Sequence, residues 1–459
     1  MVTIVPIETP TLGDRSYLAH DGQVALVVDP QRDIDRVLDL AAASGVRITH
    51  VFETHIHNDY VTGGLALAKV TGAAYHVNAA DDVAYERVPI RDGDVIDISD
   101  GLRVQVIATP GHTYTHLSYS LESRGEHVGV FSGGSLLFGS TGRPDLLGPD
   151  HTYALVHHQY ASAHRLAAEL PDVTQVLPTH GFGSFCSATQ SEATSSTIGQ
   201  EKRANPALTQ TEQDYVEDLL AGLDAYPAYY AHMGTANSAG PGAADLVAPA
   251  RADAAALRRR IEAGEWVVDL RTRAAFAKGF VPGTFNFGID GQFATYLGWI
   301  IPWGTPVTLL GESTEQVAEA QRELVRIGID RPAAAATGSP LDWTDRPLGN
   351  LARATFSDLA QVLHHRPVVV LDVRREGEWR EAHIDGAVNI PFHELLGRVA
   401  EVPDGEVWVH CAAGYRASIA ASILTAAGSQ VVAVDDSFAE QAKVAGLPVV
   451  TTPPQTHVA

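Results

Sequence analysis

The sequence predicts an α/β protein of several domains, and three observations support this prediction. Short apolar segments that read as strands alternate with helices whose apolar residues recur with a period near 3.6. Residues of metal-ligand type stand where the predicted strands end, which is where active sites of α/β proteins usually lie. Two sequence blocks in the second half of the chain occur twice. A chain of 459 residues is also too long for one hydrophobic core.

The first half of the chain contains the expected strands and helices in alternation. Residues 25–29 form an apolar strand ended by Pro30, and a helix ending near Gly45 follows, with Ile34, Val37, Leu38 and Ala41 on one face. Further strands are expected at residues 103–109, 127–132 and 173–177, each followed by a turn of small residues. This order predicts an α/β domain over residues 1–240.

The second half of the chain contains an internal repeat. The blocks at residues 267–271 and 281–286 recur at 370–374 and 384–389, and both are displaced by 103 residues (372 minus 269, and 386 minus 283). One spacing shared by two blocks predicts two copies of one α/β unit. We expect domains at residues 251–347 (the first copy) and 351–459 (the second copy), after a linker that starts with the small, uncharged segment from Asn237 to Ala244.

Composition limits the classes of partner. The chain has 32 Lys and Arg against 55 Asp and Glu, a net charge of −23, which argues against nucleic acid or an anionic membrane as a partner. The N-terminal segment lacks the pattern of a signal peptide, and no apolar run has the length of a membrane span. The two cysteines, Cys186 and Cys411, exclude a disulfide framework and predict reduced thiols in a cytoplasmic protein.

Cys411 follows a predicted strand at residues 407–410 and precedes a helix expected from Ala417 to about Ala427. A helix N-terminus and the charge of Arg416 both favour a thiolate at this position. The N–H groups of the loop (Ala412, Ala413, Gly414 and Tyr415) form a cradle for the anion of a persulfide. The pattern therefore predicts nucleophilic attack on a sulfane sulfur, and the alternative is a buried core cysteine.

Both copies resemble the rhodanese (sulfurtransferase) family. The resemblance rests on residues 371–374, Trp379, residues 383–391 and the six-residue loop from Cys411 to Arg416. In the first copy, Gly311 and Gln316 stand at the positions of Cys411 and Arg416. The resemblance therefore implies an inactive rhodanese-like domain followed by an active rhodanese domain.

A second constellation is typical of a metal site. His55, His57 and Asp59 alternate directly after an apolar run at residues 48–52, and His112 and His180 follow two later strands. Five such donors at strand ends favour a bound metal ion. The alternative is a site without metal, whose histidines serve packing and hydrogen bonding.

This part of the chain resembles the metallo-β-lactamase fold, which implies an N-terminal αββα sandwich. Tyr60 stands where that family has the last His of its His-x-His-x-Asp-His motif, and Gly134 replaces its bridging Asp. A dinuclear zinc hydrolase is therefore not expected. His55, His57 and His112 could bind one zinc ion, with Asp59 and His180 as further candidates. Alternatively, His55 and His112 could bind iron as in persulfide dioxygenases, with water, a substrate sulfur or Asp59 at the position of the missing Asp.

The whole chain resembles bacterial fusions of a persulfide dioxygenase with rhodanese domains, supported by matching blocks at residues 196–203 and 205–208. The resemblance implies one Fe(II) per chain (alternatively Zn), a low-molecular-weight thiol persulfide as substrate, and sulfite converted to thiosulfate through Cys411. It also implies an accessory thiol at Cys186, for which a small buried residue is the alternative, and we expect a homo-oligomer. Two other functions stay open, namely a mononuclear zinc thioester hydrolase resembling glyoxalase II, and a sulfurtransferase on a non-catalytic scaffold.

Overall fold

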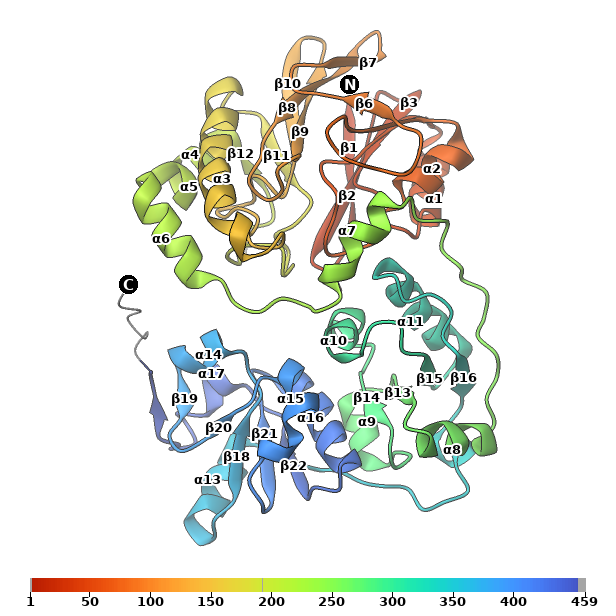
Figure 1. Ribbon diagram of the computed structural model, residues 1–459, viewed down its shortest axis with the longest axis vertical. Helices are drawn as coiled ribbons and strands as arrows, with labels where there is room; N and C mark the ends of the chain where they lie inside the picture. The colour runs from red at the N-terminus through yellow and green to blue at the C-terminus, as the bar shows by residue number, and fades with distance from the viewer. Residues whose placement is uncertain (1, 192, 453–459) are drawn as a thin grey trace. The chain divides into compact units, whose positions relative to one another are not determined.

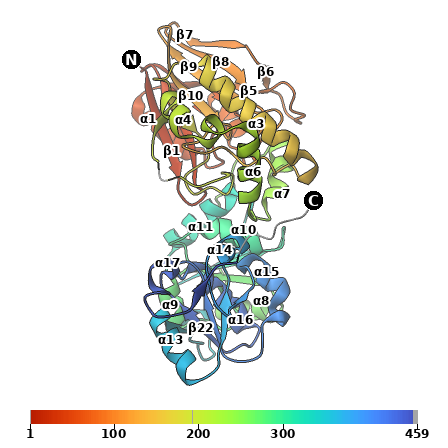
Figure 2. The same cartoon turned by 90° about the vertical axis from the view of Figure 1, so that its left-hand side faces the viewer.

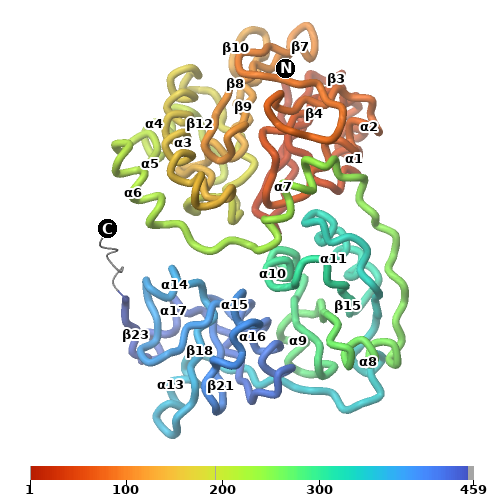
Figure 3. Tube along the Cα trace, viewed as in Figure 1, coloured from red at the N-terminus to blue at the C-terminus, as the bar shows by residue number. Residues whose placement is uncertain are grey.

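The structure is a computed structural model that describes residues 2–191 and 193–452. The chain divides into two compact units, which are described separately below (Figure 1). The first unit contains the residues up to 245 together with 324–328, and the second contains 246–323 and the residues from 329 onward. Figure 3 shows the path of the chain through both units.

The first unit contains two six-stranded sheets. The first sheet has the order β1-β2-β3-β4-β5-β6, and the second has the order β12-β11-β10-β9-β8-β7. The strands of the first sheet are β1 (Thr3–Thr9), β2 (Asp14–His20), β3 (Val24–Val28), β4 (Arg47–Phe52), β5 (Ala74–Asn78) and β6 (Val88–Ile90). Those of the second are β7 (Val95–Ser99), β8 (Leu102–Ala108), β9 (Leu117–Ser123), β10 (Glu126–Gly133), β11 (Gln175–Pro178) and β12 (Ser196–Thr197).

Helices cover the outer face of each sheet. On the first sheet these are α1 (Asp35–Ser44) and α2 (Gly64–Thr71), and on the second α3 (Pro149–Glu169), with α4 (Ile198–Ala204), α5 (Pro206–Thr209) and α6 (Glu212–Gly222) packed beside it. A seventh helix, α7 (Tyr230–Ser238), contacts the loop after β4 through Asn237. One apolar core joins the two sheets, a second lies between the first sheet and α1 and α2, and a third lies between the second sheet and α3. Figure 2 shows α3 in front of the second sheet. These three cores define four layers, and the predicted αββα sandwich is confirmed.

The strand alternation explains why these layers form. In β8, for example, Val104 and Val106 point into the core between the sheets, whereas Ile107 points toward α3. The predicted helix at the start of the chain is α1, and it ends at Gly45, whose φ of 65° suits a glycine C-cap. Strand β11 begins at Gln175, two residues later than expected, because Thr174 belongs to a turn that bonds Pro171.

The second unit contains the two copies of the repeat, each built on a parallel sheet. The first copy contains α8 (Ala254–Glu262), β13 (Trp266–Asp269), α9 (Arg273–Lys278), β14 (Phe285–Asn286), α10 (Phe293–Ile300), β15 (Val307–Gly311), α11 (Thr314–Arg326), β16 (Ala334–Thr337) and α12 (Pro340–Trp343). Its strands have the order β14-β13-β15-β16.

The second copy repeats this arrangement. It contains β17 (Ala352–Ala354), α13 (Phe356–His365), β18 (Val369–Asp372), α14 (Glu376–Glu381), β19 (His383–Ile384), β20 (Val388–Asn389), α15 (Phe392–Arg398), a 3-10 helix at Val399–Glu401, β21 (Val407–His410), α16 (Tyr415–Ala426), β22 (Val431–Val434), α17 (Phe438–Gln441) and β23 (Val449–Val450). Its sheet order, β20-β18-β21-β22-β17, matches that of the first copy strand for strand and adds β17 at one edge. The repeat read from the sequence is therefore present in the fold.

Two predicted boundaries differ from the structure. The linker expected from Asn237 begins later, because α7 continues to Ser238 and Asn237 is buried. The helix expected from Ala417 begins at Tyr415, directly after Gly414, whose φ of 91° places it in the left-handed region. The sheets lie inside the predicted ranges 1–240, 251–347 and 351–459, whose exact limits stay predictions. Among the described residues, no helix combines the length and the apolar character needed to cross a membrane.

Candidate functional site

Loops at the ends of β4, β8 and β11 bring five histidines into one buried cluster. His55 and His57 follow β4, His112 and His116 follow β8, and His180 follows β11. None of the five side chains is more than 2% exposed. The ring centre of His55 lies 4.1 to 5.4 Å from those of the other four. The strand ends thus place the predicted imidazoles together, as expected for an α/β site.

Hydrogen bonds leave one nitrogen of His112 and of His55 free inside the cluster. His112 Nδ1 lies 2.8 Å from the carbonyl oxygen of Arg143, so Nδ1 carries the proton. His112 Nε2 is buried without a hydrogen-bond partner. The hydroxyl of Thr54 donates a hydrogen bond to Asp29. It therefore accepts a hydrogen bond from His55 Nδ1, at 2.9 Å. The lone pair of His55 Nε2 then faces His180 Nε2 at 3.5 Å.

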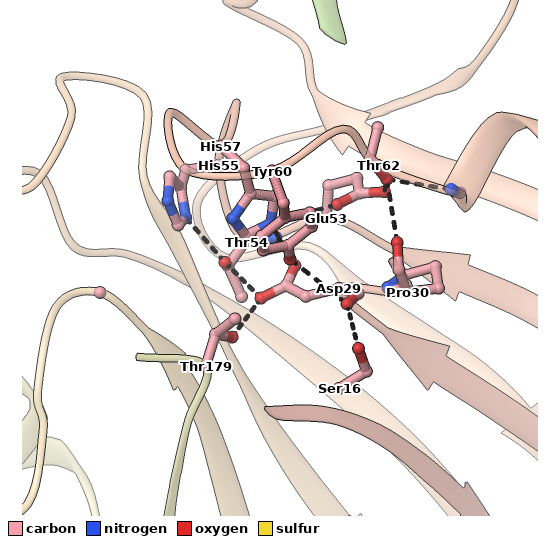
Figure 4. A network of polar contacts seen from close by, with 12 residues as sticks. Ser16, Asp29, Pro30, Glu53, Thr54, His55, His57, Tyr60, Thr62 and Thr179 are labelled. Atoms are coloured by element: carbon pink, nitrogen blue, oxygen red, sulfur yellow. Dashed lines mark hydrogen bonds and ion pairs between the residues drawn. The ribbon is translucent and has the colours of Figure 1, made fainter. Parts of the chain in front are cut away.

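Carboxylates hold His57 from one side. His57 Nε2 lies 3.2 Å from Asp29 Oδ1 and 3.3 Å from Glu53 Oε2, and its Nδ1 is buried without a hydrogen-bond partner (Figure 4). Burial alone would lower the pKa of His57, but the two carboxylates outweigh burial and raise it to about 9. This pattern, a carboxylate on one ring nitrogen and the other nitrogen free, is typical of a metal-binding histidine.

His180 shows the same pattern. Its Nδ1 lies 2.9 Å from Asp14 Oδ1 and 3.2 Å from Asp59 Oδ2. Burial would lower the pKa of His180, but Asp59 and Asp14 raise it to about 10. By contrast, burial and the charge of His180 lower the pKa of His112 to about 3. His112 is therefore neutral at pH 7, which is the form of imidazole that binds metal, whereas His57 and His180 would each release a proton when a metal ion binds.

The side chains form three overlapping groups whose donor atoms lie within 4.8 Å of one another. The groups are His55, His112 and His180; His57, Asp59 and His180; and Asp29, Glu53 and His57. A metal-binding site of His and Asp residues is therefore present, and its unpaired, buried nitrogens fit one ion. The sequence ranked His57 above His180, whereas the structure places each of them in two of the three groups. His116 was not predicted, and both its nitrogens already have partners in Thr109 Oγ1 and the N–H of Gly134.

The second predicted site lies between β21 and α16. Cys411 is 2% exposed, and the N–H of Gly414 donates to its Sγ at 3.1 Å. Ala412 is half-buried and Ala413 is exposed, and their N–H groups make no hydrogen bond among the described residues. The loop thus offers open N–H donors beside the sulfur, as a persulfide anion requires.

Arg416, whose charge the sequence predicted to lie near Cys411, is paired with a carboxylate. Its guanidinium forms two hydrogen bonds with Glu378, at 2.6 and 2.7 Å. Burial raises the pKa of Glu378, but Arg416 and Arg375 outweigh it and lower it to about 2. The charge of Arg416 is therefore compensated by a carboxylate, and its side chain is fixed against α14.

Comparisons with known proteins agree with this geometry. A model of the metallo-beta-lactamase superfamily matches residues 14–180, and one of the rhodanese-like domain matches residues 355–443. A hydroxyacylglutathione hydrolase of Synechococcus sp. is 30% identical over 231 residues, which cover 44% of this chain and 87% of that protein. The chain belongs to the metallo-beta-lactamase superfamily. The same chain carries a C-terminal rhodanese-like domain, so it is a fusion of the two, as the sequence predicted.

Other relatives of this metallo-beta-lactamase–rhodanese fusion cover different shares of it. A hydroxyacylglutathione hydrolase of Polaromonas sp. is 33% identical over 160 residues, which cover 34% of this chain but only 57% of that relative. The mitochondrial persulfide dioxygenase ETHE1 of Homo sapiens is 27% identical over 210 residues, covering 46% of this chain and 74% of that protein. The crystal structure of a metallo-beta-lactamase from Staphylococcus aureus subsp. aureus COL has a TM-score of 0.65 and 28% identity, covering 74% of this chain and 99% of that one.

The fusion departs from the family motif at two positions. Tyr60 is buried, and its hydroxyl lies 3.0 Å from His57 Nε2 and donates to the carbonyl oxygen of Asp29. Burial raises its pKa well above 10, so it stays a neutral phenol. Gly134 lies against His112, and a Cβ at position 134 would stand 2.3 Å from His112 Cδ2. The ring of His112 therefore occupies the space that a bridging Asp side chain at position 134 would need.

Replacing Gly134 by Asp is expected to reduce metal binding rather than restore a third donor. The new side chain must displace His112, and overpacking of this kind typically costs about 1–3 kcal/mol. We expect a lower metal content per folded chain and a lower midpoint of thermal unfolding. Gly101→Ala serves as the control, since a Cβ there meets no atom within 4 Å. A higher metal content in G134D would contradict the expectation.

Asp29 connects the imidazoles and was missed by sequence reasoning. Its carboxylate accepts the N–H and hydroxyl of Thr54, the hydroxyl of Thr179 and a contact from His57 (Figure 4). It therefore fixes His57 directly and His55 through Thr54. The residue stands at the end of β3 with a φ of 51°, uncommon for a residue other than glycine. That conformation turns its carboxylate toward the site, and no pattern in the sequence signals it.

Asp29→Asn is expected to weaken metal binding by about 10- to 100-fold, the usual effect of removing a carboxylate behind a metal-binding histidine. The neutral amide oxygen of asparagine accepts hydrogen bonds from His57 and Thr54 less strongly than the charged carboxylate of Asp29 does. Competition with a chelator of known affinity measures the change. Ser16→Ala is a matched control, because Ser16 bonds only the backbone oxygen of Asp29, at 2.6 Å. Equal affinities in D29N and the wild type would refute this role.

Asn237, expected in a linker, instead fixes the loop of the metal site. Its Nδ2 donates to the carbonyl oxygens of His57 and Tyr60, at 2.8 and 2.9 Å. Its Oδ1 accepts the N–H of Thr62 at 2.9 Å. An amide side chain pairs well with three backbone groups at once, because it offers both donors and an acceptor. The last helix of the first unit thereby holds the loop that carries the histidines.

Cys186 lies in the interior of the first unit with no exposed surface. Burial and the nearby charges of Asp59 and Asp14 raise the pKa of its thiol well above 9. These features favour the interpretation as a small buried residue, and an accessory catalytic role stays a prediction.

In the first rhodanese-like copy, the loop that corresponds to the Cys411 cradle is closed by its own side chain. The amide oxygen of Gln316 accepts the N–H of Glu312 at 2.7 Å, the place an anion would take. Gly311 supplies no thiol. A Cβ at this position would lie 3.0 Å from the side chain of Val317, so the space for a larger residue is narrow. The geometry supports the prediction that this copy does not transfer sulfur.

Proposed function

We propose that this fusion oxygenates a low-molecular-weight thiol persulfide at one metal ion and transfers sulfur through Cys411, giving thiosulfate. The observation that carries the proposal is the presence, in one chain, of a buried imidazole cluster with free nitrogens and of a cysteine within a loop of open N–H groups. The similarity to a mitochondrial persulfide dioxygenase supports the first activity, and the rhodanese-like domain supports the second.

The two proposed reactions balance and share sulfite. A persulfide RSSH, O₂ and water give the thiol RSH, sulfite and two protons, so oxygen is reduced while the outer sulfur is oxidised. A second persulfide loads Cys411: the Cys411 thiolate attacks its outer sulfur, a bond to Sγ forms, and the thiol RSH leaves as the sulfur–sulfur bond of the donor breaks. Sulfite then attacks the outer sulfur of the Cys411 persulfide. A new sulfur–sulfur bond forms as the bond to Sγ breaks with its electron pair, releasing thiosulfate and the Cys411 thiolate. The first product is thus the second substrate.

The chain's own residues would hold the metal through His55, His112 and His180, with His57 and Asp59 close by. Iron bound there would supply the redox chemistry that oxygen activation requires. Thr54 and the Arg143 carbonyl fix the proton on Nδ1 of two rings, so both Nε2 lone pairs point into the cluster. The low exposure of all these side chains excludes bulk water from the reacting atoms.

Metal analysis combined with oxygen uptake tests the proposal. Freshly prepared full-length protein is analysed for iron and zinc, and oxygen consumption is followed with glutathione persulfide as substrate. About one iron per chain, with oxygen uptake and sulfite or thiosulfate as products, is the expected result. Protein that contains iron but consumes no oxygen would refute the oxygenase activity.

A second candidate is a mononuclear zinc thioester hydrolase combined with the sulfurtransferase. The observation that favours it is the similarity to hydroxyacylglutathione hydrolases, together with three histidine donors, which suit zinc. Zinc in the purified protein and cleavage of a hydroxyacylglutathione thioester would support it. If neither activity depends on metal and Cys411 alone turns over substrate, the N-terminal domain is a non-catalytic scaffold.

A further inference from the structure

The inactive rhodanese-like copy packs directly against the Cys411 loop. Helix α16, which begins at the loop, lies beside β14 of the first copy (Figure 1). The hydroxyl of Tyr415 donates to the carbonyl oxygen of Gly288, and a Cβ at Gly291 would stand 2.3 Å from the ring of Tyr415. Ser418 and Asn286 are joined by a hydrogen bond of 2.7 Å. The two copies thus share one interface at the start of α16.

An arginine of the first copy stands at the edge of this loop. Arg273 Nε lies 2.7 Å from Asp435 Oδ1, and Asp435 also pairs with Arg353. The same Asp435 oxygen would lie 2.0 Å from a Cβ at Gly414, so the carboxylate touches the loop. Arg273 is therefore joined to the Cys411 loop through Asp435, which contacts Gly414.

A tyrosine of the first copy faces the same place. Tyr296 lies 5.6 Å from Tyr415 and 5.0 Å from Phe392 between ring centres. Burial raises the pKa of Tyr296, so its hydroxyl stays protonated at neutral pH. No hydrogen bond among the described residues involves this hydroxyl. A free hydroxyl on a ring that contacts Tyr415 of the Cys411 loop is a suitable donor to a bound oxyanion.

Two carboxylates are each shared by two arginines in this part of the second unit. Arg273 and Arg353 share Asp435, and Arg375 and Arg416 share Glu378. Glu378 fixes Arg416 with two hydrogen bonds, whereas the side chain of Arg273 is 33% exposed and can meet a ligand.

We propose that the first copy completes the anion-binding site of Cys411, with Arg273 as the residue that favours a dianionic sulfur compound such as thiosulfate or sulfite. This inference rests on sulfur transfer by Cys411. In the thiosulfate direction, the Cys411 thiolate attacks the outer sulfur, a sulfur–sulfur bond forms at Sγ, and the bond to the sulfonate sulfur breaks with its electron pair. Sulfite leaves as a dianion. The ligand that Arg273 meets therefore carries two negative charges both before and after the reaction.

The test is sulfur uptake by Cys411 in full-length protein, measured by mass spectrometry in single turnovers with two donors. Thiosulfate is the dianionic donor, and an organic persulfide is the monoanionic donor. For Arg273→Gln we expect the half-saturating thiosulfate concentration to rise about tenfold, the effect of one charge-assisted hydrogen bond, with a nearly unchanged maximal rate. The monoanionic donor should shift by a smaller factor.

Two variants complete the experiment. Arg273→Lys keeps the charge and should recover most of the affinity for thiosulfate, whereas Arg346→Gln, on the same copy but paired with the exposed Glu262, should behave as the wild type. Equal shifts for both donors, or no shift in R273Q while the wild type takes up sulfur, would overturn the inference alone. A wild type that takes up sulfur from neither donor would overturn the sulfurtransferase proposal, and this inference with it.

Discussion

Replacing Cys411 by serine is expected to abolish sulfur transfer while leaving metal content and oxygen uptake unchanged. A serine hydroxyl cannot form the persulfide that the proposed transfer requires, and it is not ionised at neutral pH. Loss of a covalent nucleophile typically lowers turnover by about 10⁴-fold or more. The measurement is the formation of thiosulfate from sulfite and a persulfide, alongside oxygen consumption in the same samples. Sulfite should accumulate in C411S at the rate at which the wild type forms thiosulfate.

The sulfur of Cys411 is nearly buried. The C411S variant therefore tests directly whether this thiol takes part in the reaction. With 2% exposure, a donor must approach past Ala413, the exposed residue of the loop. Cys186→Ser is the matched control, since it removes the other thiol from an interior position of the first unit. If C411S still formed thiosulfate at the wild-type rate, or if C186S lost the transfer instead, the assignment of the nucleophile would be wrong.

The Cys411 loop could be predicted from sequence because its residues are contiguous. A strand, a cysteine, small residues and a helix define the cradle locally, and Gly414 caps α16 as such a turn requires. The repeat could be predicted for a similar reason, since two blocks at one spacing imply one topology. Both features rest on neighbours in sequence.

What the sequence could not provide are contacts between distant segments. The pairing of Arg416 with Glu378 joins residues 38 positions apart, and no sequence motif predicts this pair. Asn237 fixes the His57 loop across 180 positions, and its small, uncharged neighbours suggested a linker. The importance of His180 likewise depends on two carboxylates, Asp14 and Asp59, that only the folded sheets bring to its ring.

His180→Gln is expected to abolish metal binding, and with it every metal-dependent activity. His180 belongs to two of the three groups of donors, and its loss leaves only Asp29, Glu53 and His57, which already pair with one another. It also leaves Asp14 and Asp59 as a buried carboxylate pair without a cation. Burial and the charge of Asp59 already raise the pKa of Asp14 to about 8. Breaking a buried ion pair on one side typically costs about 3–5 kcal/mol, so we also expect a lower midpoint of thermal unfolding.

His116→Gln is the control that separates coordination from packing. His116 is buried in the same cluster, 4.9 Å from His55 between ring centres, but Thr109 and the N–H of Gly134 occupy its two nitrogens. H116Q should therefore lose stability yet keep about one metal ion per folded chain, the full capacity of a single site. Metal content of both variants is measured on refolded, size-selected protein to remove unfolded chains. Retention of metal by H180Q, or its loss from H116Q alone, would mean that the ion is held by a different set of imidazoles.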